Sequence, residues 1–158
     1  MDSMGQRVTD TETAGAVVRP PHLILAALVL GFVADHVLPL QFPVARVGLA
    51  HWISAGIAVF GASLRNFSSA ATPVQGTRPS KTLVTGGIHG WSRNPIYVGM
   101  FLLYAGIGLV VRSPWILILT LPLAITIRYG VVAREEAYLE RRFGDAYRDY
   151  KTRVRRWL

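Results

Sequence analysis

Two short polar stretches carry most of the side chains that can bind a ligand. The first, residues 82–99, reads TLVTGGIHGWSRNPIYVG and offers His89, Arg93 and Asn94 before an apolar helix that should begin at Pro95. Proline suits a first helical turn, and Asn94 is a favoured N-cap residue. Because a helix N-terminus presents free N–H groups and a partial positive charge, this stretch suits a carboxylate or a phosphate. A capped helix start after a loop explains the same pattern without a ligand.

The second stretch opens with Glu135 and Glu136, directly after an apolar segment. These carboxylates can hold an ammonium group or ribose hydroxyls, while Trp91 or Tyr97 can stack on a ring or face a cation. A ligand with a carboxylate, an amine, a sugar, a base and a sulfonium would use all of these groups. S-adenosylmethionine is one such ligand, although the pattern alone does not single it out.

The elements that must position these stretches are long and apolar. Half of the 158 residues are apolar, and they come in blocks, which is typical of membrane proteins. We predict an all-α fold, an integral membrane bundle of four transmembrane helices. The predicted spans are about residues 22–40, 47–64, 95–111 and 114–132.

Small residues within these segments should let the helices pack closely. Gly106 and Gly108 form a GxG inside the third span, but no strand precedes them. We therefore interpret them as packing glycines rather than as a dinucleotide fingerprint. The polar residues 1–21 should be a disordered cytoplasmic tail, and residues 22–158 should form one membrane domain.

The charged C-terminal stretch predicts a cytoplasmic amphipathic helix. Gly144 should stop the preceding helix, and Asp145 should cap the final one. Apolar side chains recur there at helical spacing, with most basic residues on the other face, as in a helix that lies on lipid headgroups. The apolar positions are Tyr147, Tyr150, Val154 and Trp157.

Charge and composition narrow the class of partner. The net charge is +8, but the basic residues flank apolar segments, which fits anionic membrane lipids better than nucleic acid. The chain has no cysteine and its four histidines lie far apart, so no metal is expected. Four spans would leave only Arg46 and Arg112 of the seventeen basic residues on one side. The positive-inside rule therefore predicts that residues 65–94 and the C-terminal stretch are cytoplasmic.

The sequence LVTGGIHGWSRNPIYVG, together with the later REEAYLERRFGDAYRDYKTRVRRWL, resembles the isoprenylcysteine carboxyl methyltransferase family of integral membrane enzymes. The resemblance covers roughly residues 65–158. Its most specific parts are the R-N-P-x-Y core at 93–97, the pair Glu135-Glu136 and the FGxxYxxY run at 143–150. It implies a multi-spanning methyltransferase that uses S-adenosylmethionine without a soluble Rossmann domain.

The resemblance also implies roles for individual residues. The family's arginine that orients the substrate carboxylate would fall at Val131 in this chain. Arg128, seven residues before Glu135, lies on the same face of a regular α-helix and can take its place. A snorkelling residue at the membrane interface is the alternative interpretation of Arg128. The implied cofactor contacts are Lys81, Thr82, Leu83, Val84, His89, Asn94, Pro95, Ile96, Tyr97 and Glu135.

The expected function is methyl transfer to a lipophilic or prenylated acceptor at the cytoplasmic membrane face, most simply carboxyl O-methylation of an isoprenylcysteine-like substrate. Arg128 and Glu136 are the candidate catalytic residues. A carboxylate nucleophile is already ionised, whereas an amine or a thiol would need deprotonation by Glu136 or His89. An N-methyltransferase acting on a lipid amine is the alternative enzyme. A non-catalytic membrane binding or assembly module is the alternative from another class.

Overall fold

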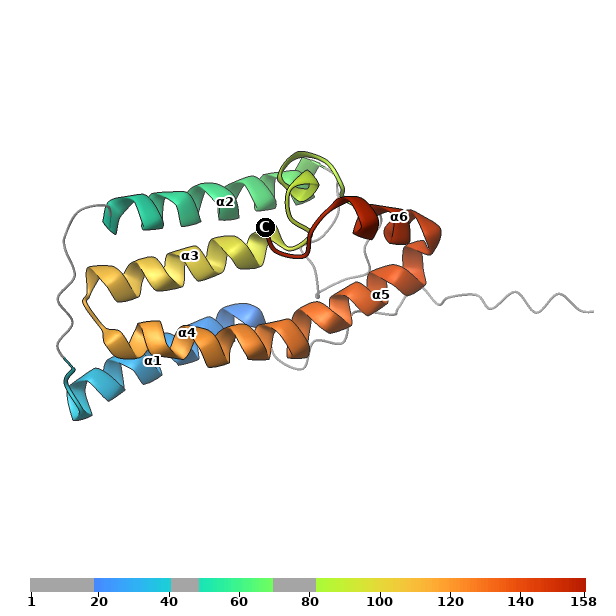
Figure 1. The fold of residues 1–158 in the computed structure, drawn as a ribbon. Helices are drawn as coiled ribbons and strands as arrows, with labels where there is room; N and C mark the ends of the chain where they lie inside the picture. Colours follow the sequence, from blue (N-terminus) through green and yellow to red (C-terminus); the bar gives the residue numbers. More distant parts are fainter. Residues whose placement is uncertain (1–18, 41–48, 70–81) are drawn as a thin grey trace, which may run out of the picture.

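Every regular element in the described part of the chain is a helix (Figure 1). The computed structural model describes residues 19–40, 49–69 and 82–158. The all-α prediction is confirmed for these residues. The elements are α1 (Pro20–Val37), α2 (Leu49–Ser69), η1 (Gly87–Gly90), α3 (Pro95–Val110), α4 (Pro114–Ile127), η2 (Arg128–Val132), α5 (Ala133–Phe143) and α6 (Asp145–Arg153).

Proline sets the start of three helices. α3 and α4 begin at Pro95 and Pro114, as predicted, because proline tolerates the first turn, where no N–H is needed. α1 begins at Pro20, so the last two residues of the predicted tail are helical instead. α2 continues to Ser69, five residues beyond the predicted end of its span. The remainder of the predicted tail and Lys81 lie outside the described residues.

Two helices among the described residues are long and apolar enough to cross a membrane. They are Pro20–Val37 and the continuous helix Pro114–Phe143, with mean hydropathies of 1.5 and 2.0 over their most apolar windows. Two shorter apolar stretches are also helical: Ile53–Arg65, which is part of α2, and Pro95–Val110, which is α3. The described chain is thus all-helical, with two candidate membrane spans.

Glycines set how closely the helices approach. α2 lies beside α3, and α1 lies beside α4 (Figure 1). A Cβ atom added at Gly106 would lie 2.9 Å from Ile53 Cγ1, and one added at Gly108 would lie 2.8 Å from Ile116 Cγ2. Both glycines therefore pack against a neighbouring helix, which confirms the predicted packing role.

A tight turn joins α3 to α4, in the short gap between the predicted third and fourth spans. Arg112 adopts a positive φ of 57° between the two helices. The Ser113 hydroxyl then caps α4 by accepting a hydrogen bond from the Ile116 N–H at 3.0 Å. The turn holds the two helices together without a longer loop.

The continuous helix from Pro114 changes its winding at Arg128. Residues Arg128–Val132 form a π-helical turn, η2, between α4 and α5. A π turn contains more residues than an α turn, so side chains beyond it face a different direction from the one that α-helical spacing predicts. The assumption of a regular helix between Arg128 and Glu135 is therefore wrong.

The C-terminal stretch also differs from its prediction. Gly144, with a φ of 53°, ends α5 as predicted, but Asp145 makes no cap. Its carboxylate instead accepts from Arg148 Nη2 at 2.6 Å. α6 ends at Arg153 and the chain continues in an extended conformation at Val154, so Trp157 is not part of the helix. The C-terminal residues return to the N-terminal end of α3 (Figure 1).

Close helix contact at Gly56 generates a test of the α2–α3 packing. A Cβ atom there would lie 2.7 Å from the backbone nitrogen of Leu103, whereas one at Gly61, also in α2, would meet nothing within 4 Å. We predict that Gly56→Ala destabilises the protein by about 1–3 kcal/mol through overpacking. Gly61→Ala should be neutral or stabilising, because alanine favours helix more than glycine does. Thermal unfolding in detergent, followed by circular dichroism, measures both; equal melting temperatures would contradict the packing.

Candidate functional site

Tyr97 and Glu135 form the centre of the site. Tyr97 lies in the first turn of α3 and Glu135 in the first turn of α5. The Tyr97 hydroxyl donates to the Glu135 carboxylate, with distances of 2.9 and 3.0 Å to its two oxygens. Both side chains are buried, with 3% of each residue exposed. The structure thus joins two predicted cofactor contacts that are 38 residues apart in the sequence.

Glu136 forms a separate cluster with two arginines. Its carboxylate accepts from Arg156 Nη2 at 2.6 Å and from Arg156 Nε at 3.0 Å, and Arg93 Nη2 lies 3.5 Å away. The Glu136 and Arg93 side chains are about nine-tenths buried. The hydrogen bond to Glu136 raises the pKa of Arg156. Two guanidinium groups therefore balance the negative charge of Glu136, which the sequence predicts as a catalytic residue.

The residues before α3 bind the C-terminal segment rather than cap the helix. Asn94 occupies the N-cap position of α3, but its side chain makes no cap and instead Nδ2 donates to the Arg156 carbonyl at 3.1 Å. The Ser92 hydroxyl donates to the same carbonyl at 3.4 Å. The Arg93 N–H donates to the Arg155 carbonyl at 2.9 Å. The predicted side-chain cap is therefore wrong. The Asn94 amide is oriented towards the Arg156 carbonyl, 62 residues away in the sequence, and not towards the N–H groups of α3.

His89 is buried within the loop that precedes α3. Burial lowers the pKa of His89 to about 4, so its imidazole is neutral at physiological pH. Its backbone carbonyl accepts from the Tyr150 hydroxyl of α6 at 2.6 Å. Burial raises the pKa of Tyr150 to about 12, so this hydroxyl stays protonated. The bond fastens the loop to the C-terminal helix.

The remaining predicted contacts differ in burial. Leu83 packs against a small cluster of Tyr138, Leu139, Tyr147 and Tyr150, which joins the loop to α5 and α6. Pro95 and Ile96 are buried, Val84 is half-buried, and Thr82 is exposed. Trp91, considered for stacking, has 81% of its surface exposed.

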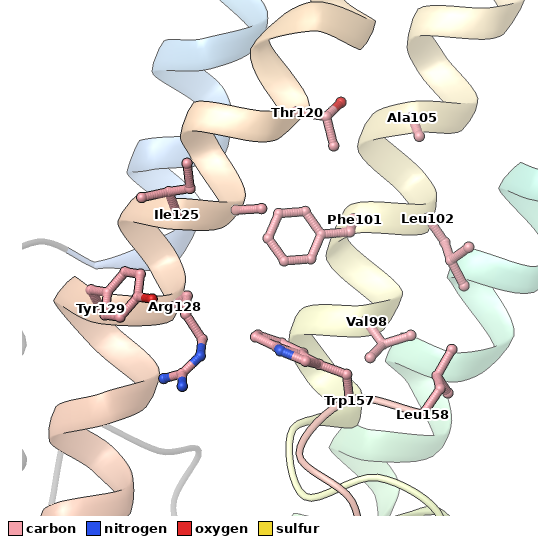
Figure 2. A pocket seen from close by; sticks show the side chains of 11 residues that line it. Val98, Phe101, Leu102, Ala105, Thr120, Ile125, Arg128, Tyr129, Trp157 and Leu158 are labelled. Atoms are coloured by element: carbon pink, nitrogen blue, oxygen red, sulfur yellow. The ribbon is translucent and has the colours of Figure 1, made fainter.

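Arg128 lines a different part of the molecule, an apolar cavity of about 600 Å³ between α3 and α4 (Figure 2). Its guanidinium lies over the Tyr129 ring, 5.1 Å from the ring centre. Ile125 and Tyr129, on the α4 side, are 51% and 67% exposed, so the cavity opens at the outer surface of the bundle. The lining residues are Val98, Phe101, Leu102, Ala105, Thr120, Ala124, Ile125, Arg128, Tyr129, Trp157 and Leu158.

Sequence reasoning missed Arg156 and Trp157 as parts of the site. Arg156 binds Glu136, and Trp157 lines the cavity beside Phe101. The amphipathic pattern instead predicts a surface helix with Trp157 on its apolar stripe and basic residues such as Arg156 mostly off that stripe. The available signal was the RRW sequence at the end of the chain, where two cations precede a large aromatic residue.

Comparison with known proteins identifies the class of the chain. The family model described as phospholipid methyltransferase matches residues 36–146. A stretch of 27 residues is 70% identical to an uncharacterized protein of Haemophilus influenzae, covering 17% of this chain and 43% of that protein. The match thus spans less than half of that relative's length. No solved structure matches the chain significantly.

The buried, neutral state of His89 generates a prediction about pH. The histidine of an unfolded chain titrates near 6.5, so between about pH 6.5 and pH 4 the unfolded state binds more protons than the folded state. The stability that the folded state gains from neutral His89 is complete above pH 6.5 and is lost as the pH falls towards 4. We predict that His89→Gln loses less of its melting temperature between pH 7 and pH 4.5 than the wild type does. His51→Gln, at an exposed histidine, is the control; parallel pH profiles for all three proteins would contradict a buried neutral His89.

Proposed function

We propose a function from one premise: the chain belongs to the phospholipid methyltransferase family, whose members are membrane methyltransferases and include isoprenylcysteine carboxyl methyltransferases. These enzymes generally use S-adenosylmethionine. The chain transfers a methyl group from S-adenosylmethionine to the carboxylate of a lipophilic, isoprenylcysteine-like acceptor at the cytoplasmic membrane face. The observation that carries this proposal is the cationic Arg128 in a cavity whose other walls are mostly apolar.

Four spans accommodate this function. The two longer candidates are α1 and the continuous helix Pro114–Phe143 that begins with α4. α1 and α3 each pack against α4, and α2 packs against α3. Four crossings put residues 82–94 and the chain beyond Val132 on one side, together with most of the basic residues. The positive-inside rule makes that side cytoplasmic. The cluster around Glu135 and Glu136 then lies where a soluble cofactor is present.

The donor and acceptor groups of the site fit S-adenosylmethionine. Arg93 has two buried nitrogens, Nε and Nη1, without a hydrogen-bond partner among the described residues, and either of them can donate to the carboxylate of the methionyl group. Among the described residues, the Glu135 carboxylate has only the neutral Tyr97 hydroxyl as a partner, so it can bind the ammonium group or the ribose hydroxyls. Bound S-adenosylmethionine supplies an electrophilic methyl group on a positive sulfur. The residues that would hold it are Arg93, Glu135, Tyr97, Asn94, Pro95, Ile96, His89 and residues 81–84.

Two features favour a carboxylate acceptor over an amine. A carboxylate needs no base, and the two bases considered for an amine are poor ones: burial lowers the pKa of His89 to about 4, which makes it a weak base, and Glu136 is held by two arginines. In addition, the Arg128 guanidinium attracts a carboxylate in a low-dielectric cavity and repels an ammonium group. Arg128 orients the acceptor carboxylate, and the cavity walls hold its apolar chain away from water.

A lipid amine is the second candidate acceptor. The observation that favours it is the family description itself, which names phospholipids. A phospholipid amine carries a neighbouring phosphate, and Arg128 can bind that phosphate as it would a carboxylate.

A transfer assay with tritiated S-adenosylmethionine tests the proposal and separates the two acceptors. Two acceptors with the same farnesyl chain, one ending in a carboxylate and one in a primary amine, are compared in detergent. We predict transfer to the carboxylate and a loss of about tenfold or more in kcat/KM in Arg128→Ala, since a charge-assisted hydrogen bond contributes about 1.5–3 kcal/mol. Arg128→Lys should be impaired as well, because lysine lacks the planar pair of donors. Arg141→Lys, an exposed change in α5, is the control. Transfer to the amine alone would select the second candidate, and full activity in both Arg128 variants would overturn the role of Arg128.

The topology has its own test, because the chain contains no native cysteine. Thr85 and Arg112 are both exposed, and they lie on opposite sides of a four-span bundle. In intact cells, an impermeant maleimide should label Arg112→Cys and leave Thr85→Cys unlabelled until the membrane is permeabilised. Labelling of Thr85→Cys in intact cells would contradict the cytoplasmic site.

A further inference from the structure

The C-terminal segment 154–158 is fixed across the end of α3 next to the cavity. The carbonyls of Arg155 and Arg156 accept hydrogen bonds from the Arg93 N–H and the Asn94 side chain, at 2.9 and 3.1 Å. The Arg156 guanidinium is paired with Glu136 at 2.6 Å. Backbone and side chain are thus both fixed at the residues immediately before Trp157. The position of Trp157 is consequently set by contacts with α3 and α5.

Trp157 extends from this fixed backbone into the cavity between α3 and α4. Its ring meets the Phe101 ring edge-on, with centroids 6.3 Å apart and an interplanar angle of 70°. Figure 2 shows the indole between Arg128 on one side and the α3 side chains on the other. It therefore forms one wall of the space through which the proposed acceptor carboxylate would approach the guanidinium.

The size of the cavity makes this position restrictive. A volume of about 600 Å³ is in the range that holds one small-molecule ligand. A large, rigid indole at its Arg128 end leaves room beside the guanidinium for a narrow head group with a single chain. A second chain on the same head group would meet Trp157 and Phe101 on the α3 side, so it would have to share with the first chain the opening beside Ile125 and Tyr129.

We infer that Trp157 is a specificity-determining residue, whose indole limits the acceptor at the Arg128 end of the cavity to one with a single apolar chain. This inference rests on the proposed function, because it names the class of acceptor for the same site. Glu136 and Arg156 act through it as positioning residues, since their ion pair fixes the backbone from which the indole extends.

Selectivity between two acceptors tests the inference by activity. The farnesyl carboxylate is compared with an acceptor that carries the same carboxylate on two chains. We expect Trp157→Ala to reduce the single-chain to two-chain ratio of kcat/KM by about tenfold or more, within the range that pocket shape alone supplies. Trp157→Phe should keep most of the ratio, because it keeps an aromatic ring. Trp115→Phe is the control, since Trp115 lies on α4 and its indole N–H donates to Leu38. An unchanged ratio in Trp157→Ala would overturn the inference.

A binding measurement without cofactor separates failure of this inference from failure of the proposed function. A single-chain carboxylate with bromine atoms near its head group should quench tryptophan fluorescence in the wild type and in Trp115→Phe. The quenching should be largely lost in Trp157→Phe, which remains folded by circular dichroism. Lost quenching without methyl transfer by the wild type would support the ligand position and refute the proposed reaction. Equal quenching in wild type and Trp157→Phe would overturn the inference even if methyl transfer is observed.

Discussion

The ion pairs of Glu136 are the constraint on which the cytoplasmic end of the molecule depends. One carboxylate binds Arg93 before α3 and Arg156 after α6, so it joins three segments that are distant in sequence. Breaking a buried pair by removing one partner costs about 3–5 kcal/mol, because the remaining charges stay buried without compensation. With the pairs intact, the backbone hydrogen bonds between residues 92–94 and 155–156 form beside them. The loop, the start of α3 and the C-terminal segment therefore form one unit.

Two adjacent glutamates thus have different surroundings. Two arginines compensate the charge of Glu136, which holds the structure together, whereas the oxygens of buried Glu135 contact only the Tyr97 hydroxyl within the described part of the chain. A buried carboxylate with so little compensation is costly, and such groups are frequent at functional sites. The π turn before the glutamates also separates Arg128 from Glu135. Arg128 lines the α3–α4 cavity, whereas Glu135, beyond the turn, contacts Tyr97. The proposed cofactor and acceptor sites consequently consist of different residues, and they come closest in sequence on α3, where Tyr97 belongs to the first and Val98 to the second.

Local signals in the sequence predicted the elements better than the contacts between them. Pro95, Pro114 and Gly144 marked helix ends correctly, because their effects on the backbone are local. The amphipathic pattern overextended α6 to Trp157, since it cannot reveal that the carbonyls of residues 155 and 156 bond to residues some 60 positions earlier. The π turn was equally invisible to a periodicity of 3.6 residues. The family resemblance predicts Tyr97 and Glu135 as cofactor contacts, and the structure adds that the two side chains are hydrogen-bonded to each other.

The central claim is that Glu135 belongs to a site for S-adenosylmethionine, and calorimetric titration of the purified protein tests it most directly. Glu135→Gln keeps the size of the side chain and removes the charge, while Glu140→Gln removes a carboxylate of the same helix that pairs with Lys151 away from the site. The account predicts binding to the wild type and to Glu140→Gln, and an affinity weaker by about tenfold or more in Glu135→Gln. Equal affinity in all three proteins, or no binding to a folded wild type, would contradict it.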